Sequence, residues 1–129
     1  MLMLEDQDYC NMDMCMELDV LGCPIPKHDT INLYTKERNT VYGKFTLYEA
    51  QKWLRKKHQL HISTKPYPTE SGLMWMFEVR KITPYMVCVE VNKTGFWWSE
   101  EAFSEGINEC IKLLKKYELE SNDIVSDTN

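Results

Sequence analysis

Residues 46–62 read TLYEAQKWLRKKHQLHI and carry the strongest structural signal in the chain. Thr46 and Glu49 have the spacing of a capping box, in which the two side chains satisfy free backbone N–H groups at a helix start. Apolar residues then recur at intervals of three or four, which places them on one helix face: Leu47, Ala50, Trp53 and Leu54. Basic residues in the last turns suit the helix dipole. The stretch predicts a helix over residues 47–58.

Three strands and a second helix are predicted after it. Residues 60–65, 73–79 and 85–91 alternate apolar and polar side chains and are rich in β-branched and aromatic types, as half-buried strands are. Prolines and a Ser-Gly pair between the first two strands predict a loop there. Ser99 is a good helix N-cap, and an apolar stripe continues to Tyr117. Residues 46–117 therefore predict α-β-β-β-α order with an antiparallel sheet.

The N-terminal third gives weaker signals. Residues 12–20 predict a short helix, and residues 31–35 and 40–42 predict a β-hairpin with a four-residue loop. The expected fold is a single α+β domain over residues 1–117. In it, residues 1–45 cover the free face of the sheet, and residues 118–129 form a frayed acidic tail.

Composition fits one folded domain and excludes several classes of protein. The chain has 129 residues, of which 43% are hydrophobic and 27% charged, and its net charge of −5 argues against a general nucleic-acid binder. No apolar run is long enough to span a membrane. The first nine residues lack the basic region of a secretion signal, and five cysteines indicate reduced thiols. We therefore expect a cytoplasmic protein.

The predicted elements define a core and one close contact. We expect a mostly buried set of large side chains: Trp53, Leu54, Phe77, Ile107 and Ile111. Gly106 lies inside the last predicted helix, where glycine costs about 1 kcal/mol relative to alanine. Such a glycine predicts close packing of that helix against another element.

Methionines mark the sheet face opposite the two helices. Met74 and Met76 alternate with the core side chains of the second strand, and Met86 and Cys88 are expected in similar positions on the third. A face left open by the helices is normally polar. Either residues 1–45 cover this face, or a homodimer or a bound protein completes the cover, a role that suits adaptable methionine side chains.

Two further groups of residues suggest binding. Trp97 and Trp98 are adjacent, so we expect one to be buried and the other to be exposed for an interface or a nucleobase. The basic helix carries Lys52, Arg55, Lys56 and Lys57, a candidate surface for nucleic acid. The α-β-β-β-α order is that of the double-stranded-RNA-binding domain. However, Glu100 and Glu101 stand where that domain needs basic groups to hold phosphate.

Catalytic and metal chemistry have little support. Cys10, Cys15, Cys23 and His28 have gaps looser than the two to four residues usual for structural zinc. No local signature pairs a cysteine with His28, His58 or His61 as a base. Four glutamates on the last helix suit a solvated face: Glu100, Glu101, Glu105 and Glu109. No glycine-rich phosphate loop is present. We expect no catalysis, no cofactor and no bound metal, with a small nuclease or phosphodiesterase as the remaining enzymatic alternative.

Two stretches carry a resemblance to known proteins. TLYEAQKWLRKKHQLHI (residues 46–62) and WSEEAFSEGINECIKLL (residues 98–114) resemble a group of small uncharacterised proteins of phages and prophage-like elements in gut anaerobic bacteria. The group supplies no activity and no catalytic residues. The resemblance implies an accessory protein, for example in counter-defence, that works in the bacterial host cell by binding a host protein or a small ligand. A nucleic-acid-binding role for the basic helix is the alternative.

Overall fold

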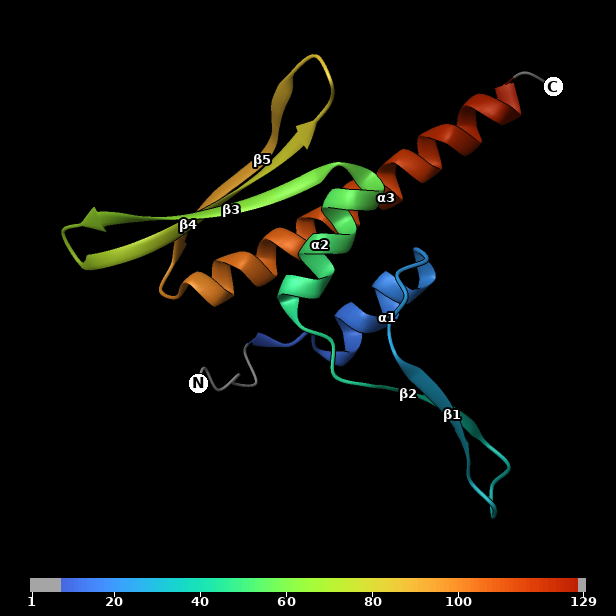
Figure 1. Cartoon of the computed structure of the whole chain (residues 1–129). Helices are drawn as coiled ribbons and strands as arrows, with labels where there is room; N and C mark the ends of the chain where they lie inside the picture. The colour runs from blue at the N-terminus through green and yellow to red at the C-terminus, as the bar shows by residue number, and fades with distance from the viewer. Residues whose placement is uncertain (1–7, 128–129) are drawn as a thin grey trace.

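The computed structural model describes residues 8–127, and the side chains of residues 8–119. Residues 1–7, most of the stretch searched for a secretion signal, lie outside the described residues. The chain forms α1 (Met12–Val20), β1 (Lys27–Ile31), β2 (Arg38–Tyr42), α2 (Leu47–His58), β3 (Leu60–Thr69), β4 (Gly72–Ile82), β5 (Val87–Phe96) and α3 (Ser99–Asp127). The predicted single α+β domain and its α-β-β-β-α order are confirmed (Figure 1).

The helix α2 has the predicted bounds because its capping box forms. The Glu49 backbone N–H donates to Thr46 Oγ1 at 3.0 Å, and the Thr46 backbone N–H donates to Glu49 Oε1 at 3.3 Å. Gln59 ends the helix in the left-handed conformation, with φ 57°. The buried Gln51 side chain accepts from the Ile62 backbone N–H at 2.9 Å, which ties α2 to the strand that follows it.

The main sheet is antiparallel with the order β3-β4-β5, and its strands are longer than predicted. The loop expected at Pro66 and Pro68 is wrong, because β3 continues through both residues. An edge strand tolerates proline where the missing N–H faces away from its neighbour, and β3 is an edge strand. The third strand begins at Val87 rather than at residue 85 and runs past Gly95 with two register shifts.

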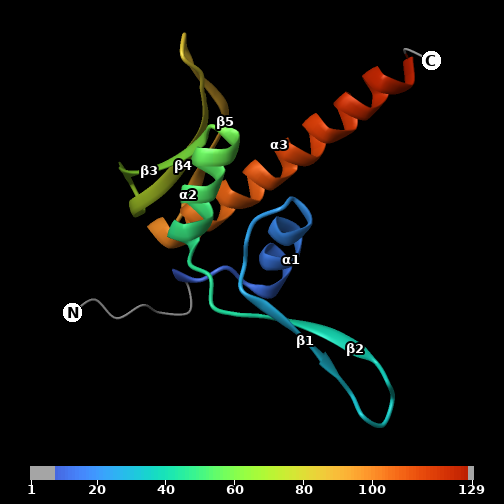
Figure 2. The same cartoon turned by 45° about the vertical axis from the view of Figure 1, so that its right-hand side comes forward.

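Helices α2 and α3 cover one face of this sheet (Figures 1 and 2). Of the predicted core, Leu54, Phe77, Ile107 and Ile111 are fully buried, whereas Trp53 is only half-buried. A Cβ atom on Gly106 would lie 2.6 Å from Ile62 Cγ2, which confirms the close contact between α3 and the sheet. The helix α3 continues beyond Tyr117 to Asp127, where we expected a frayed tail. No described helix is long and apolar enough to cross a membrane.

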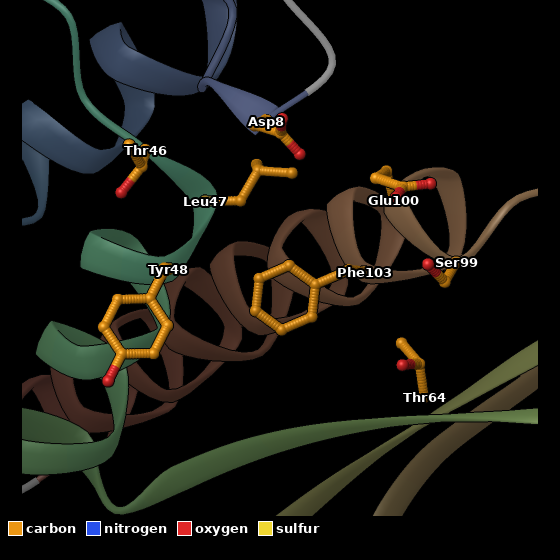
Figure 3. A pocket seen from close by; sticks show the side chains of 8 residues that line it. All are labelled: Asp8, Thr46, Leu47, Tyr48, Thr64, Ser99, Glu100 and Phe103. Atoms are coloured by element: carbon orange, nitrogen blue, oxygen red, sulfur yellow. The ribbon is translucent and has the colours of Figure 1, made fainter. Parts of the chain in front are cut away.

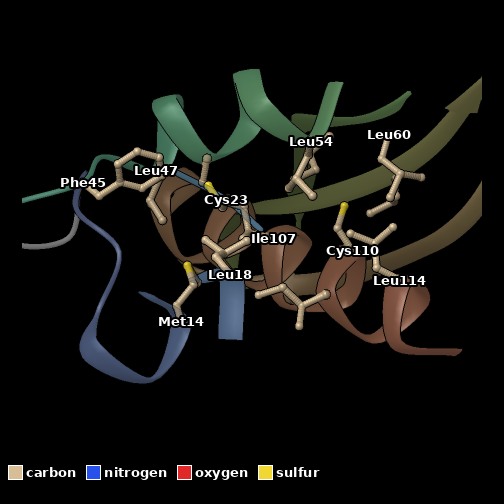
Figure 4. Close-up of a cluster of buried hydrophobic side chains, with 14 of the residues drawn as sticks. Met14, Leu18, Cys23, Phe45, Leu47, Leu54, Leu60, Ile107, Cys110 and Leu114 are labelled. Carbon is tan, nitrogen blue, oxygen red and sulfur yellow. The ribbon is translucent and has the colours of Figure 1, made fainter. Parts of the chain in front are cut away.

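Within the described part of the N-terminal third, residues 8–45, no element covers the free sheet face, contrary to expectation. The helix α1 packs on the side of α2 and α3 that is turned away from the sheet (Figure 2). There Met14, Leu18 and Cys23 join Phe45 and Leu47 in the buried cluster (Figure 4). The physical reason is that α1 buries Met14, Cys15 and Leu18 against the two longer helices, so these side chains are not available to the sheet.

The strands β1 and β2 form a hairpin that projects from the body of the molecule (Figures 1 and 2). Its first strand lies earlier than predicted, at Lys27–Ile31 instead of residues 31–35. Asn32 explains the shift, because its side chain accepts from the backbone N–H groups of Tyr34 and Thr35 and so begins the turn at that point.

Candidate binding site

A pocket of about 470 Å³ lies between the first turns of α2 and α3 (Figure 3). Its lining comes from four parts of the fold: the N-terminal segment, α2, β3 and α3. The lining residues are Asp8, Thr46, Leu47, Tyr48, Thr64, Ser99, Glu100 and Phe103. Ligand sites are typically concave and mostly apolar, with a few polar groups, and this pocket has that character.

Local hydrogen bonds fix both walls of the pocket. The capping box holds the start of α2, and the Cys10 backbone N–H donates to the Phe45 carbonyl at 2.8 Å just before it. On the opposite wall, the Ala102 backbone N–H donates to the Trp98 carbonyl at 3.1 Å and closes the first turn of α3. Two helix starts and a strand therefore form a preorganised frame for the side chains in the pocket.

The lining combines aromatic rings with carboxylates. The ring of Phe103 extends from α3 toward α2 (Figure 3), and Tyr48 and Leu47 line the pocket from the first turn of α2. Asp8 and Glu100 lie at one rim. An apolar group that carries a positive charge would meet hydrophobic contact inside the pocket and opposite charge at its edge, so this is the chemistry that the pocket suits best.

Trp97 and Trp98 lie in the short connection between β5 and α3, next to this pocket. The expectation that one of them is buried is wrong: Trp97 is 55% exposed and Trp98 is 66% exposed. Strand alternation does not apply to them because β5 ends at Phe96. Trp98 also lines a neighbouring cavity of about 340 Å³, which shares Glu100 with the first pocket. The exposed aromatic surface of Trp98 therefore lies beside the pocket.

The predicted methionine face is less uniform than the sequence indicated. Met74 and Met76 are half-buried on the face of β4 opposite Phe77 and Val79, as expected. Met86 lies in the β4–β5 turn and is exposed. Cys88 pairs with Lys81, whose Nζ donates to the His58 carbonyl, so Cys88 lies on the helical side of the sheet.

The centre of that open face is charged, which corrects the expectation of a wholly apolar surface. Glu78 accepts from Arg80 at 2.6 Å and lies 3.8 Å from Lys65 Nζ. These partners lower the pKa of Glu78, with the Arg80 hydrogen bond as the main cause. The ion pairs give the face its own polar groups, which water can solvate without a covering element.

The basic helix presents its charges to solvent. Lys52, Arg55 and Lys56 are exposed on α2, and none of them forms an ion pair within the described part of the chain. Positive charges also act on two histidines at the junction of α2 and β3, where burial is the main cause of the pKa shifts. Burial, reinforced by nearby lysines, lowers the pKa of His58, and burial together with Arg55 and Arg80 lowers the pKa of His61.

Three of the four residues considered for zinc lie close to the N-terminal core. Burial is the main cause that raises the pKa of Cys10 and of Cys23 to about 12, and the charge of Cys15 adds to both shifts. His28 lies on the exposed strand β1. Between residues 8 and 127, no group of three or more His, Cys, Asp or Glu side chains is arranged to hold a metal ion.

The sequence did not identify the pocket itself. Leu47 was expected in the apolar stripe of α2, Phe103 fell within the apolar stripe of the last helix, and Glu100 was expected on a solvated face. Thr64 was expected only as a residue of the first strand, and Asp8 and Tyr48 were given no role. The one available signal was Tyr48, a large aromatic residue outside the apolar stripe of α2, and it is 68% exposed. The chain matches none of the protein-family models, curated proteins or solved structures with which it was compared.

Proposed function

We propose that this chain is a non-enzymatic binding protein of a phage or another mobile element, which holds a host protein at the pocket between α2 and α3. The observation that supports the proposal is the pocket itself: an apolar cavity of about 470 Å³ with Asp8 and Glu100 at its rim. The resemblance of residues 46–62 and 98–114 to phage and prophage proteins supplies the biological context of a bacterial host cell.

The partner segment is defined by the chemistry of this site. An apolar side chain enters between Tyr48 and Phe103, and a neighbouring lysine or arginine faces the carboxylates. Trp97 and Trp98 extend the contact surface, because tryptophan is enriched among the residues that dominate interface energies. A cation beside these rings gains a further attraction to their faces.

The test compares two tyrosine variants in affinity capture from host lysate. Tyr48→Asp places a charge in the pocket, whereas Tyr85→Asp makes the same change in the β4–β5 turn, where Tyr85 is 96% exposed. We expect a host protein that wild type and Tyr85→Asp retain equally and that Tyr48→Asp retains about tenfold less, as for a hot-spot residue. Quantitative mass spectrometry of the eluates measures the difference.

Two further variants test the tryptophan surface and the charge at the rim. Trp98→Ala should also weaken capture, and Glu100→Lys should weaken it most at low salt, because screening reduces exposed charge interactions. Circular dichroism checks that each variant is folded. If every host protein bound Tyr48→Asp and Tyr85→Asp alike, the pocket would not be the binding site.

The basic helix supports a second candidate function, which is binding of nucleic acid. The observation in its favour is that Lys52, Arg55 and Lys56 are exposed without acidic partners among the described residues. Phosphate contacts weaken steeply as salt rises, so a titration of labelled RNA and DNA at several salt concentrations tests it. Binding that falls with salt and is lost in Lys52→Glu/Lys56→Glu would favour this alternative over the pocket.

A further inference from the structure

The β1–β2 hairpin is an arm that is anchored at its base and leaves its tip in solvent (Figures 1 and 2). At the base, Lys27 Nζ donates to Asp19 Oδ1 at 2.8 Å, and the Tyr42 hydroxyl donates to Asp19 Oδ2 at 3.1 Å. At the tip, Leu33 and Tyr34 are both exposed. An isolated two-stranded hairpin is at best marginally stable in water, so this arm gains stability from a surface that buries its tip.

The tip has a fixed shape. The Asn32 side chain accepts from the backbone N–H groups of Tyr34 and Thr35 at 2.9 and 3.1 Å, and the Lys36 backbone N–H donates to the Asn32 carbonyl at 2.8 Å. Tyr34 is held at this turn with 97% of its surface exposed. A loop that is already ordered loses less conformational entropy when it binds, so the turn presents Tyr34 as a preorganised anchor.

The pocket between α2 and α3 suits a tyrosine side chain. The rings of Tyr48 and Phe103 and the hydroxyl of Ser99 are part of its lining (Figure 3), and its volume is about 470 Å³. Aromatic rings favour offset or edge-to-face contact with one another, and a buried tyrosine hydroxyl usually finds a polar partner. The pocket supplies both kinds of contact to the ring and the hydroxyl of Tyr34.

The charges of the tip and the pocket are complementary. Lys36 and Arg38 follow Tyr34 and outnumber the single acid of the tip, Glu37. Neither of the two bases forms an ion pair within the described part of the chain, and Glu100 at the pocket rim forms none there either. The tip therefore has the chemistry that the pocket suits, an aromatic side chain beside a positive charge.

We propose that the tip of the β1–β2 hairpin docks in the α2–α3 pocket of a second copy of this chain, with Tyr34 inside and Lys36 facing Glu100. The tip points away from the pocket of its own chain (Figures 1 and 2), so the contact joins two molecules. The β4–β5 turn is a poorer ligand, because Tyr85 is equally exposed but residues 82–89 contain no lysine or arginine. The inference rests on the proposed function in that it uses the same pocket.

The oligomeric state of the purified full chain tests this contact. Light scattering at about 100 µM should give at least twice the chain mass for wild type, because even a modest interface is populated at that concentration. Tyr34→Asp and Tyr48→Asp should each raise the dissociation constant about tenfold or more, as for tyrosines at the centre of an interface. Tyr85→Asp, the same change at an equally exposed tyrosine, should leave the association unchanged.

A mixing experiment tests whether the tip of one chain meets the pocket of another. A Tyr34→Asp chain keeps its pocket, and a Tyr48→Asp chain keeps its tip. A tagged Tyr48→Asp chain should therefore retain an untagged Tyr34→Asp chain, whereas neither variant should retain a second copy of itself. A chain with both substitutions is the negative control, and circular dichroism checks that each variant is folded.

The outcomes separate this inference from the proposed function. A monomeric wild type would overturn the inference, as would equal association of Tyr34→Asp and Tyr85→Asp or failure of the mixed pair to associate. Loss of assembly in Met76→Asp but not in Tyr34→Asp would also overturn it and would place the interface on the methionine face. The proposed function instead fails when capture of a host protein does not depend on Tyr48. In that lysate experiment Tyr34→Asp should retain at least as much host protein as wild type, because its pocket is free.

Discussion

Gly106 lies at the closest approach of α3 to the sheet, where an added Cβ would meet Ile62 Cγ2 at 2.6 Å and Phe77 Cδ2 at 3.4 Å. Ile62 is buried and β-branched, so its side chain has few other rotamers to adopt. Gly106→Ala should therefore destabilise the fold by about 1–3 kcal/mol despite the better helix propensity of alanine. Urea unfolding measures this, and Lys116→Ala on the exposed side of α3 should change stability by less than about 0.5 kcal/mol.

Ile107, the next residue, tests the opposite change in packing, which is the removal of a buried side chain instead of the addition of one. Its side chain is fully buried between α3 and the rest of the core. Ile107→Ala removes this side chain and leaves a cavity, which should cost about 2–5 kcal/mol of unfolding free energy. Denaturant midpoints that barely moved would contradict the position of α3 over the sheet.

The cysteines should differ sharply in reactivity. Burial raises the pKa of Cys10, Cys23 and Cys110 to about 12, so at pH 8 only about one thiol in 10⁴ at each site is the reactive thiolate. Cys88 is half-exposed on β5. Iodoacetamide should modify Cys88 first, as peptide mass spectrometry can follow, and urea should make all five cysteines react. Fast labelling of Cys10 or Cys23 in the folded protein would contradict the buried cluster around α1.

At the scale of elements, two histidines at the junction of α2 and β3 should make the free energy of unfolding depend on pH. The folded state lowers the pKa of His58 and His61 below the ordinary value of 6.5. As the pH falls below 6.5, the unfolded chain therefore takes up protons before the folded chain does, and stability decreases. Glu78 and Glu109 have lowered pKa values, so their contribution is lost at more acidic pH, below about 4.5.

Chemical unfolding at pH 7 and at pH 5.5 measures the histidine effect. Replacement of both histidines by glutamine should reduce the difference in unfolding free energy between these two pH values, because the groups that titrate are then absent. His28→Gln on the exposed strand β1 is the matched control and should leave that difference unchanged. An equal loss of stability in the double variant and in wild type would contradict the role of the α2–β3 junction.

At the scale of the whole molecule, adjacent residues of β4 should respond in opposite ways to the same substitution. Phe77 is fully buried beneath the helices, whereas Met76 lies on the open face with the Glu78 ion pairs. Phe77→Asp should unfold the chain, because a buried unpaired carboxylate is costly. Met76→Asp should keep a near-normal circular dichroism spectrum. Unfolding of Met76→Asp would show that this face is internal core.

The candidate site illustrates the limit of local patterns. The capping box and apolar stripe determine where α2 starts, and the sequence Ser99-Glu100-Glu101 indicates the start of α3 equally well. That the two helix starts and Thr64 of β3 line one pocket depends on the turn angles between five elements, and no local pattern contains those angles. Residues such as Phe103 and Glu100 therefore received local interpretations, as core and as solvated surface, although they line one cavity.

The sequence by itself determined the elements with strong periodicity: α2 with its capping box, the order of the three strands, the core side chains of α3 and the tight contact at Gly106. It determined them because short-range forces, namely capping hydrogen bonds and the burial of periodic apolar side chains, act within a few residues. Only the tertiary structure decided which elements cover which surface. The helix α1 filled the groove under α2 and α3 instead of the sheet face, Trp97 and Trp98 both reached solvent, and proline entered β3 because that strand became an edge. Each outcome depends on which surfaces meet when distant segments pack, and side-chain spacing along the chain does not encode that choice.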